Sequence, residues 1–215
     1  MGVNRLIKYN REIHMKSRAE FIKKKNMKEL RSKILTVLMI ISIVFFSSIY
    51  FILQYTLEVE NPIVVVTSGS MEPTIYKGDI LIIEHKDPED IKSGTVENLE
   101  GDIILYDSSN IWPNPRDQLI VHRVVGKRYD TATEQWMFET KGDNNPDKDP
   151  PGAAEKIEVP ETEIRGVVKQ IIPKIGWVKI VLDEYNLTLP LTIFLGILLI
   201  ISFITDNSES EKKKE

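Results

Sequence analysis

The sequence predicts a mostly β domain, built as a partly closed barrel or a sandwich and flanked by two transmembrane helices. Three observations support this prediction. A 20-residue apolar run without charge or proline, residues 34–53, follows a basic N-terminal arm. Short β-branched runs separated by Gly, Pro, Asn and Asp clusters occupy residues 58–186, and a second apolar run covers residues 187–204. No segment outside the arm and the apolar runs shows sustained helical periodicity, so strands are expected between the two runs.

The N-terminal arm is strongly basic. Residues 1–33 carry eleven Lys and Arg against three Glu, whereas residues 58–186 carry 14 basic and 25 acidic side chains. A basic arm can bind nucleic acid, but this one runs directly into the apolar residues 34–53. At about 1.5 Å of rise per residue, 20 residues span roughly the 30 Å hydrocarbon core of a bilayer. Since Lys and Arg mark the cytoplasmic end of a spanning helix, the arm is expected to be cytoplasmic, with no nucleic-acid partner.

Two other structures would also contain such an apolar run. A cleavable signal peptide has an apolar core of about 7–15 residues followed by a small-residue cleavage site, and Gln54–Glu58 offers no such site. A buried core helix usually has a polar stripe, which residues 34–53 lack. We therefore interpret residues 34–53 as an uncleaved transmembrane anchor.

The second apolar run is 18 residues long, near the lower limit for a membrane span. Lys212, Lys213 and Lys214 follow it in a charged tail, residues 205–215, which is therefore expected to be cytoplasmic as well. Two spans with both tails inside place residues 58–186 on the extracytoplasmic side of a multi-pass protein of the cell membrane.

The part between the spans is expected to form short strands joined by turns. The β-branched and aromatic runs predict six strands, at residues 62–66, 80–84, 103–106, 118–125, 135–140 and 164–172. The chain has no cysteine, which excludes thiol nucleophiles, disulfides and cysteine metal sites. Such a domain must be held together by its apolar core alone, and its length is sufficient for one core.

The segment Ser68–Thr74 (SGSMEPT) places hydroxyls among turn-forming residues a short way past the anchor. Ser70 could act as a nucleophile if a base removed its proton. Of the three histidines, His14 lies in the arm and His85 in a charged turn, whereas His122 lies in an apolar, strand-like run. An imidazole, with an ordinary pKa of about 6.5, is suited to this role at neutral pH. The alternative is a turn serine and an ordinary surface or core histidine.

A base histidine is usually oriented by a carboxylate on its other ring nitrogen. Asp143, Asp147 and Asp149 are the candidates, and spacing alone does not choose among them. The same loop could be a plain acidic surface or a weak calcium site. The backbone N–H of Ser70 and the hydroxyl of Ser68 are the candidate donors to an oxyanion, although Ser68 could equally be a simple turn residue.

Five motifs in this order, SGSMEPT, KGD, GDIILY, VHRVVG and KGDNN, resemble those of the type I signal peptidases across residues 62–168. The bacterial branch of that family has a lysine base where this chain has His122, so the chain is similar to the archaeal and endoplasmic-reticulum branch. The resemblance implies a serine endopeptidase that removes signal peptides from exported preproteins through an acyl-enzyme. No metal or organic cofactor is expected, and the partners would be signal peptides, the lipid bilayer and the secretion machinery.

Carried over by position, the resemblance implies that Ser70 is the nucleophile, His122 the general base and Ser68 an oxyanion-hole donor. Two aspartates of the family map to Asp143 and Asp149, with Asp149 favoured as the partner of His122 and Asp143 as support. Two alternatives remain. Soluble self-cleaving repressors also place a serine before methionine but use lysine, and a membrane-anchored β domain could bind a partner without any catalysis.

Overall fold

The computed structural model describes residues 2–112, 119–150 and 157–211 of the 215-residue chain. The described residues divide into two compact units, with the boundaries after Ser48 and after Leu187. One unit, from Ile49 to Leu187, contains all the described strands, and the other contains helical segments. The expected mostly β character of the central part is confirmed.

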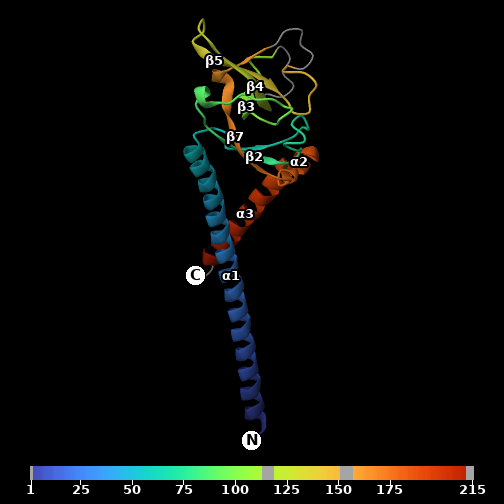
Figure 1. Cartoon of the computed structure of the whole chain (residues 1–215). Helices are drawn as coiled ribbons and strands as arrows, with labels where there is room; N and C mark the ends of the chain where they lie inside the picture. Colours follow the sequence, from blue (N-terminus) through green and yellow to red (C-terminus); the bar gives the residue numbers. More distant parts are fainter. Residues whose placement is uncertain (1, 113–118, 151–156, 212–215) are drawn as a thin grey trace. The chain divides into compact units, whose positions relative to one another are not determined.

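One antiparallel sheet of seven strands forms the central unit (Figure 1). The strands are β1 (Ile63–Val65), β2 (Ile80–Glu84), β3 (Ile103–Asp107), β4 (Leu119–Asp130), β5 (Gln135–Lys141), β6 (Val159–Pro160) and β7 (Ile164–Ile172). Their order in the sheet is β1-β2-β7-β3-β4-β5-β6. Two short 3-10 turns, Pro88–Asp90 and Glu161–Glu163, lie between strands. In the described part of the chain β1 and β6 end the sheet without pairing with each other, so the expected partial closure into a barrel is not seen.

Apolar side chains pack into two clusters that share the strands of the sheet. Alternate residues of β3 divide between them, because successive side chains of a strand point to opposite faces. The first cluster contains Ile91, Ile104, Tyr106, Ile120, Val124, Phe138, Val159 and Val167. The second contains Leu57, Val59, Met71, Ile75, Leu81, Ile83 and Leu105. The same alternation directs His122 and Arg123, neighbours on β4, to opposite sides of the sheet.

Most of the predicted strands agree with the observed ones to within one or two residues. The exception is β4, which continues past Gly126 to Asp130. Its register against β5 shifts between Val124 and Gly126, so the glycine sits at an irregularity within the ladder and does not end the strand. The two-residue strand β6 was not expected, because a segment of this length that contains Pro160 carries no alternating pattern.

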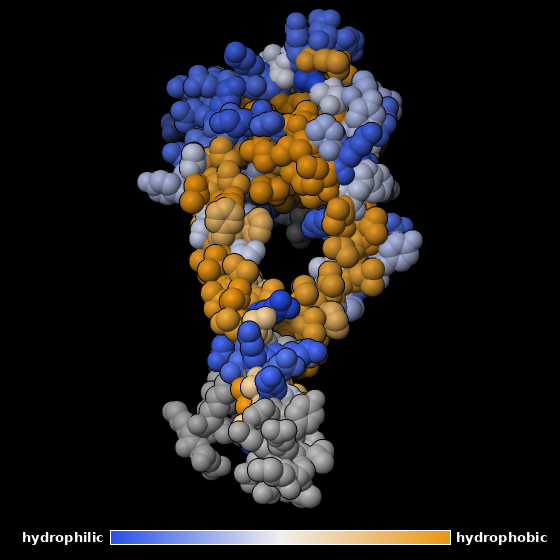
Figure 2. Space-filling view, turned by 90° about the horizontal axis from the view of Figure 1, so that it is seen from below, coloured by the Kyte–Doolittle hydropathy of each residue, from blue (hydrophilic) through white to orange (hydrophobic). Residues whose placement is uncertain are grey.

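The described part of the chain also contains three helices, α1 (Gly2–Leu57), α2 (Trp177–Glu184) and α3 (Thr188–Glu211). In the described part of the chain one helix, α1 from His14 onward, is long and apolar enough by itself to cross a membrane. Residues 177–184 and 188–201 pass the same test only when they are taken together as one broken span. Apolar side chains cover much of the surface of the helical segments (Figure 2). The lysines at 212–214 that were expected to flank the second span lie outside the described residues.

The last turn of α1 is part of the β unit. Leu57 and Val59 are buried in the second cluster, and Leu53 packs against it. The amide of Gln54 donates to the Glu60 carbonyl (2.7 Å), and the backbone N–H of His85 donates to the Leu57 carbonyl (2.8 Å). The chain therefore leaves the helix and enters the sheet through a segment held by both apolar packing and hydrogen bonds.

Candidate active site

The loop that carries Ser70 is attached to the core directly after the serine. Met71 is 2% exposed and Ile75 fully buried, and both belong to the second cluster. The N–H of Ile75 donates to the Met71 carbonyl (2.9 Å), and the N–H of Glu72 donates to the Gly69 carbonyl (3.2 Å). Two buried side chains and two tight turns thus fix the backbone around Ser70, whose own side chain is only half-buried.

A second loop, residues 142–145, braces the Ser70 loop from the other side. The backbone N–H of Asn144 donates to the Ser70 carbonyl (2.8 Å), and its side-chain amide donates to the Gly69 carbonyl (3.1 Å). Gly142 is needed at this contact, because a Cβ there would lie 2.7 Å from the Ser70 carbonyl oxygen. The KGDNN motif therefore holds the serine loop through backbone contacts, in addition to supplying an aspartate.

His122 lies between a hydroxyl and a carboxylate. Its Nε2 is 3.0 Å from Ser70 Oγ, and its Nδ1 is 2.5 Å from Asp149 Oδ2. His122 is 5% exposed and Asp149 is 3% exposed, so water does not compete strongly for these contacts. A carboxylate only accepts hydrogen bonds, so the Nδ1 proton is directed to Asp149 and Nε2 is left to accept the proton of Ser70.

Asp143 does not contact His122 and pairs instead with Arg123. The guanidinium meets the carboxylate through two parallel contacts, Nε to Oδ1 (2.8 Å) and Nη2 to Oδ2 (2.7 Å). Arg123 also donates to the Leu99 and Gly101 carbonyls (3.0 Å each). Thr74 Oγ1 donates to Asp143 Oδ2 (2.5 Å) and so joins the serine loop to this pair. Asp143 thus forms a buried ion pair on the opposite side of β4 from His122, and its expected supporting role stays a prediction.

Ser68 lies beside Ser70, with 3.3 Å between the two Oγ atoms. Ser68 is exposed, so this side of the Ser70 hydroxyl is open to solvent. His85 is not among the residues around Ser70, since its exposed ring lies 3.5 Å from Asp87. Within the described residues, no group of three or more His, Asp or Glu side chains is arranged to hold a metal ion.

Sequence reasoning missed three side chains of this region. Tyr106 Oη and Thr140 Oγ1 both donate to Asp149 Oδ2, at 3.2 and 2.7 Å. Arg123 was given no role, although a charged residue inside an apolar strand signals a buried partner. No comparable signal exists for the two hydroxyls, because threonine and tyrosine are ordinary strand residues.

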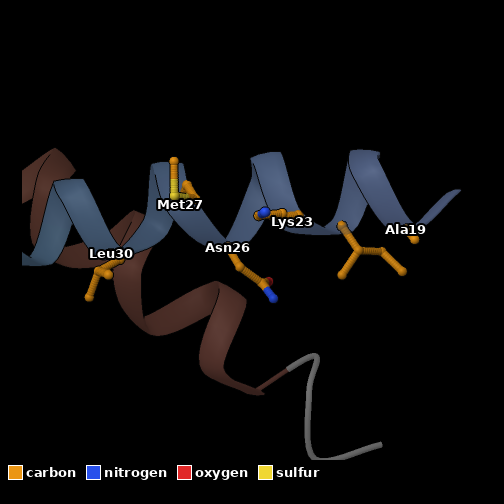
Figure 3. A pocket seen from close by; sticks show the side chains of 6 residues that line it. Ala19, Lys23, Asn26, Met27 and Leu30 are labelled. Carbon is orange, nitrogen blue, oxygen red and sulfur yellow. The ribbon is translucent and has the colours of Figure 1, made fainter. Parts of the chain in front are cut away.

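A shallow recess on α1 includes none of these residues (Figure 3). It is lined by Ala19, Ile22, Lys23, Asn26, Met27 and Leu30. Because all six lie on one helix at spacings of one, three and four residues, the recess is a space between neighbouring side chains of a helix surface. It offers neither a nucleophile with a base nor an enclosed volume.

A hydroxyl, an imidazole and a carboxylate joined in this order are the arrangement of the serine hydrolases. Comparison with known proteins shows which serine hydrolases this chain is similar to. The chain is 34% identical to the signal peptidase complex catalytic subunit SEC11 of Zygosaccharomyces rouxii over 145 residues, which are 66% of this chain and 78% of the yeast protein. It is 32% identical to the subunit of the same name from Schizosaccharomyces pombe over 167 residues, 72% of this chain and 83% of that protein.

A third relative, the SEC11 subunit of Lachancea thermotolerans, is 37% identical over 126 residues, 58% of this chain and 67% of its own length. No protein-family model matches the chain. The similarity to these subunits nevertheless covers more than two thirds of their length at above 30% identity. The chain therefore belongs to the family of signal peptidase complex catalytic subunits, as the resemblance of its motifs predicts.

Proposed function

We propose that this chain is a membrane-bound serine endopeptidase that removes N-terminal signal peptides from preproteins. The observation that carries the proposal is the unbroken line from Ser70 Oγ through His122 to Asp149, with distances of 3.0 and 2.5 Å, in a chain of this family. The reaction it supports is acyl transfer to a serine hydroxyl, with a histidine as the acid and base.

In this mechanism Ser70 Oγ attacks the carbonyl carbon of the scissile bond while its proton passes to His122 Nε2. The charge that develops on the carbonyl oxygen would be stabilised by the backbone N–H of Ser70 and the hydroxyl of Ser68. The C–N bond then breaks, and the imidazolium gives its proton to the departing amine of the mature protein. Water next attacks the ester as His122 takes its proton, and that proton returns to Ser70 Oγ as the signal peptide leaves.

The sheet offers a place for an extended substrate. Strand β1 ends the sheet, with β2 as its neighbour among the described strands. An extended signal peptide would add beside residues 62–66 by main-chain hydrogen bonds, with small side chains one and three residues before the cleaved bond. The serine loop begins immediately after this strand, at Ser68, so the substrate's carbonyl would reach Ser70 as the chain runs past it.

We further propose two membrane spans, residues 34–53 and 187–204, with residues 1–33 and 205–215 in the cytoplasm. Residues 58–186 would then be the extracytoplasmic peptidase domain of a multi-pass protein. The apolar character of α1 supports the first span. The exposed apolar side chains of residues 187–201 support the second. Signal peptides are cleaved just past their apolar core, so a site that follows directly on a membrane anchor is placed suitably for this substrate.

Cleavage of a preprotein by the purified full-length chain in detergent tests the proposal. We expect one cut after a small residue, identified by the intact masses of both products. A bulky side chain in place of that residue should slow cleavage at least about tenfold, because a small pocket does not accept it. Failure of the wild-type chain to cut preproteins with small residues at these positions, or cutting that ignores the residue, would contradict the proposal.

Replacement of Gly142 tests how the serine loop is held. We expect Gly142→Ala to lower kcat/KM by about 10- to 100-fold, since an added Cβ would displace the Ser70 carbonyl, and small shifts of a reacting group are costly. Gly196→Ala is the matched control, because a Cβ there meets nothing within 4 Å. Equal kcat/KM values for the Gly142 variant and the wild type would show that the loop contact is not important for the reaction.

A further inference from the structure

One oxygen of Asp149 receives every hydrogen bond recorded for its carboxylate. Oδ2 accepts from His122 Nδ1 (2.5 Å), Thr140 Oγ1 (2.7 Å) and Tyr106 Oη (3.2 Å). The other oxygen, Oδ1, is buried and has no partner in the described part of the chain. A carboxylate usually distributes its donors over both oxygens, because each can accept about two hydrogen bonds. This one-sided arrangement therefore needs a physical reason.

The three donors come from three neighbouring strands. Tyr106 lies on β3, His122 on β4 and Thr140 on β5, and these strands are adjacent in the sheet. Thr140 holds Asp149 a second time, since its backbone carbonyl accepts the Asp149 N–H (2.9 Å). Each strand thus directs one donor at the same atom, and the geometry of the sheet determines where that atom lies.

Neither hydroxyl is available to water. Tyr106 is fully buried and Thr140 is 1% exposed. Desolvation by burial, followed by the nearby charge of Asp149, raises the pKa of Tyr106 far above its usual range, so the phenol keeps its proton and acts as a donor. Thr140 Oγ1 also lies 3.2 Å from Tyr106 Oη, but a hydroxyl has a single proton, and the shorter distance of 2.7 Å directs it to the carboxylate.

We propose that Tyr106 and Thr140 are positioning residues of the active site, which hold one oxygen of the Asp149 carboxylate against the His122 Nδ1 proton and keep the carboxylate plane from turning. The inference rests on the proposed function and deepens it. With Oδ2 fixed, the carboxylate cannot rotate about its Cβ–Cγ bond, and the imidazole is held with Nε2 toward Ser70. Without the two hydroxyls the carboxylate is free to turn, and the imidazole loses its fixed orientation.

The test compares three conservative variants in the preprotein assay. Thr140→Val keeps the shape of the side chain and removes its hydroxyl, Thr140→Ser keeps the hydroxyl and removes a methyl group, and Tyr106→Phe removes a single oxygen. We expect kcat to fall about 10- to 100-fold in Thr140→Val and less in Tyr106→Phe, with unchanged KM, since residues that orient a reacting group typically contribute this much. Thr140→Ser should restore most of the wild-type kcat.

A second readout does not depend on turnover. The short contact between His122 Nδ1 and Asp149 Oδ2 should give a far-downfield proton resonance in a Ser70→Ala background, which we expect to shift or broaden in Thr140→Val. The proposal is overturned if the Thr140→Val and Thr140→Ser variants lose equal activity, if Thr140→Val keeps its kcat, or if the resonance does not change. Should the wild-type chain cut no preprotein, the proposed function fails, and the resonance alone still decides whether the hydroxyls position the pair.

Discussion

Substitution of Ser70 by alanine is expected to abolish preprotein cleavage while the protein still folds. The side chain is half-buried and its recorded polar contacts are with Ser68 and His122, so little of the packing depends on it. Loss of the nucleophile of a Ser-His-Asp set typically lowers kcat by about 10⁶-fold. His122→Ala should cost about as much, because the hydroxyl and its base act as one unit.

The measurement is single-turnover cleavage at saturating enzyme, together with a thermal melt that verifies folding. Ser68→Ala serves as the graded control, since loss of one oxyanion donor costs about 10²- to 10³-fold. A membrane-anchored β domain that only binds a partner would keep its function in Ser70→Ala. Undiminished cleavage in His122→Ala would point to a different base, and Lys141 would be the next residue to replace.

The strands were predictable from sequence because their residues carry the required information locally. Runs such as Ile80–Glu84 and Ile164–Ile172 are rich in β-branched residues and bounded by turn residues, and the observed strands have these bounds. Helix α2 was missed because eight residues make only about two turns, too few to establish a helical period. Extension of β4 beyond Gly126 depends on pairing with β5, which no local pattern reveals.

For the candidate site, the sequence predicts the serine and the histidine, but its spacing does not decide between the two aspartates. The motifs predict Ser70 and His122 as candidate residues, and the structure brings the two side chains to 3.0 Å although 52 positions separate them. The choice between Asp143 and Asp149 depends on the path of the loop after β5. Asp143 follows the strand directly and meets Arg123, whereas Asp149 returns to the strand through its N–H bond to the Thr140 carbonyl. The spacing of the aspartates in the sequence does not show that the loop brings Asp149 back to β5.

Asparagine at position 149 is expected to lower kcat by about 10⁴-fold and to leave the fold intact. The amide has almost the same shape as the carboxylate, and its oxygen can still accept from Thr140 and Tyr106. It carries no charge, however, so it cannot stabilise the imidazolium that forms when His122 takes the proton of Ser70. If the amide nitrogen faced His122 Nδ1, the ring would also adopt the wrong tautomer.

Asparagine at position 143 should have the opposite effect, which is a loss of stability with little change in kcat. The side chain of Asp143 is fully buried and that of Arg123 is 3% exposed, so removal of one charge leaves the other buried without a counter-ion. The expected loss in the free energy of unfolding is about 3–5 kcal/mol. In the fraction that folds, kcat should stay within about tenfold of wild type, because Asp143 has no contact with His122 and acts through the backbone of the serine loop.

A comparison of Asp149→Asn with Asp143→Asn distinguishes a residue needed for the reaction from a residue needed for stability. Single-turnover rates and denaturant midpoints should give a slow but stable Asp149→Asn protein, and an unstable Asp143→Asn protein whose folded fraction remains active. Arg123→Met would provide a matched control for the second variant, since it removes the other half of the same ion pair. A large loss of kcat in stably folded Asp143→Asn, with near-normal kcat in Asp149→Asn, would exchange the roles of the two aspartates. The base would then have to be oriented from the opposite side of β4, which the hydrogen bonds of His122 do not support.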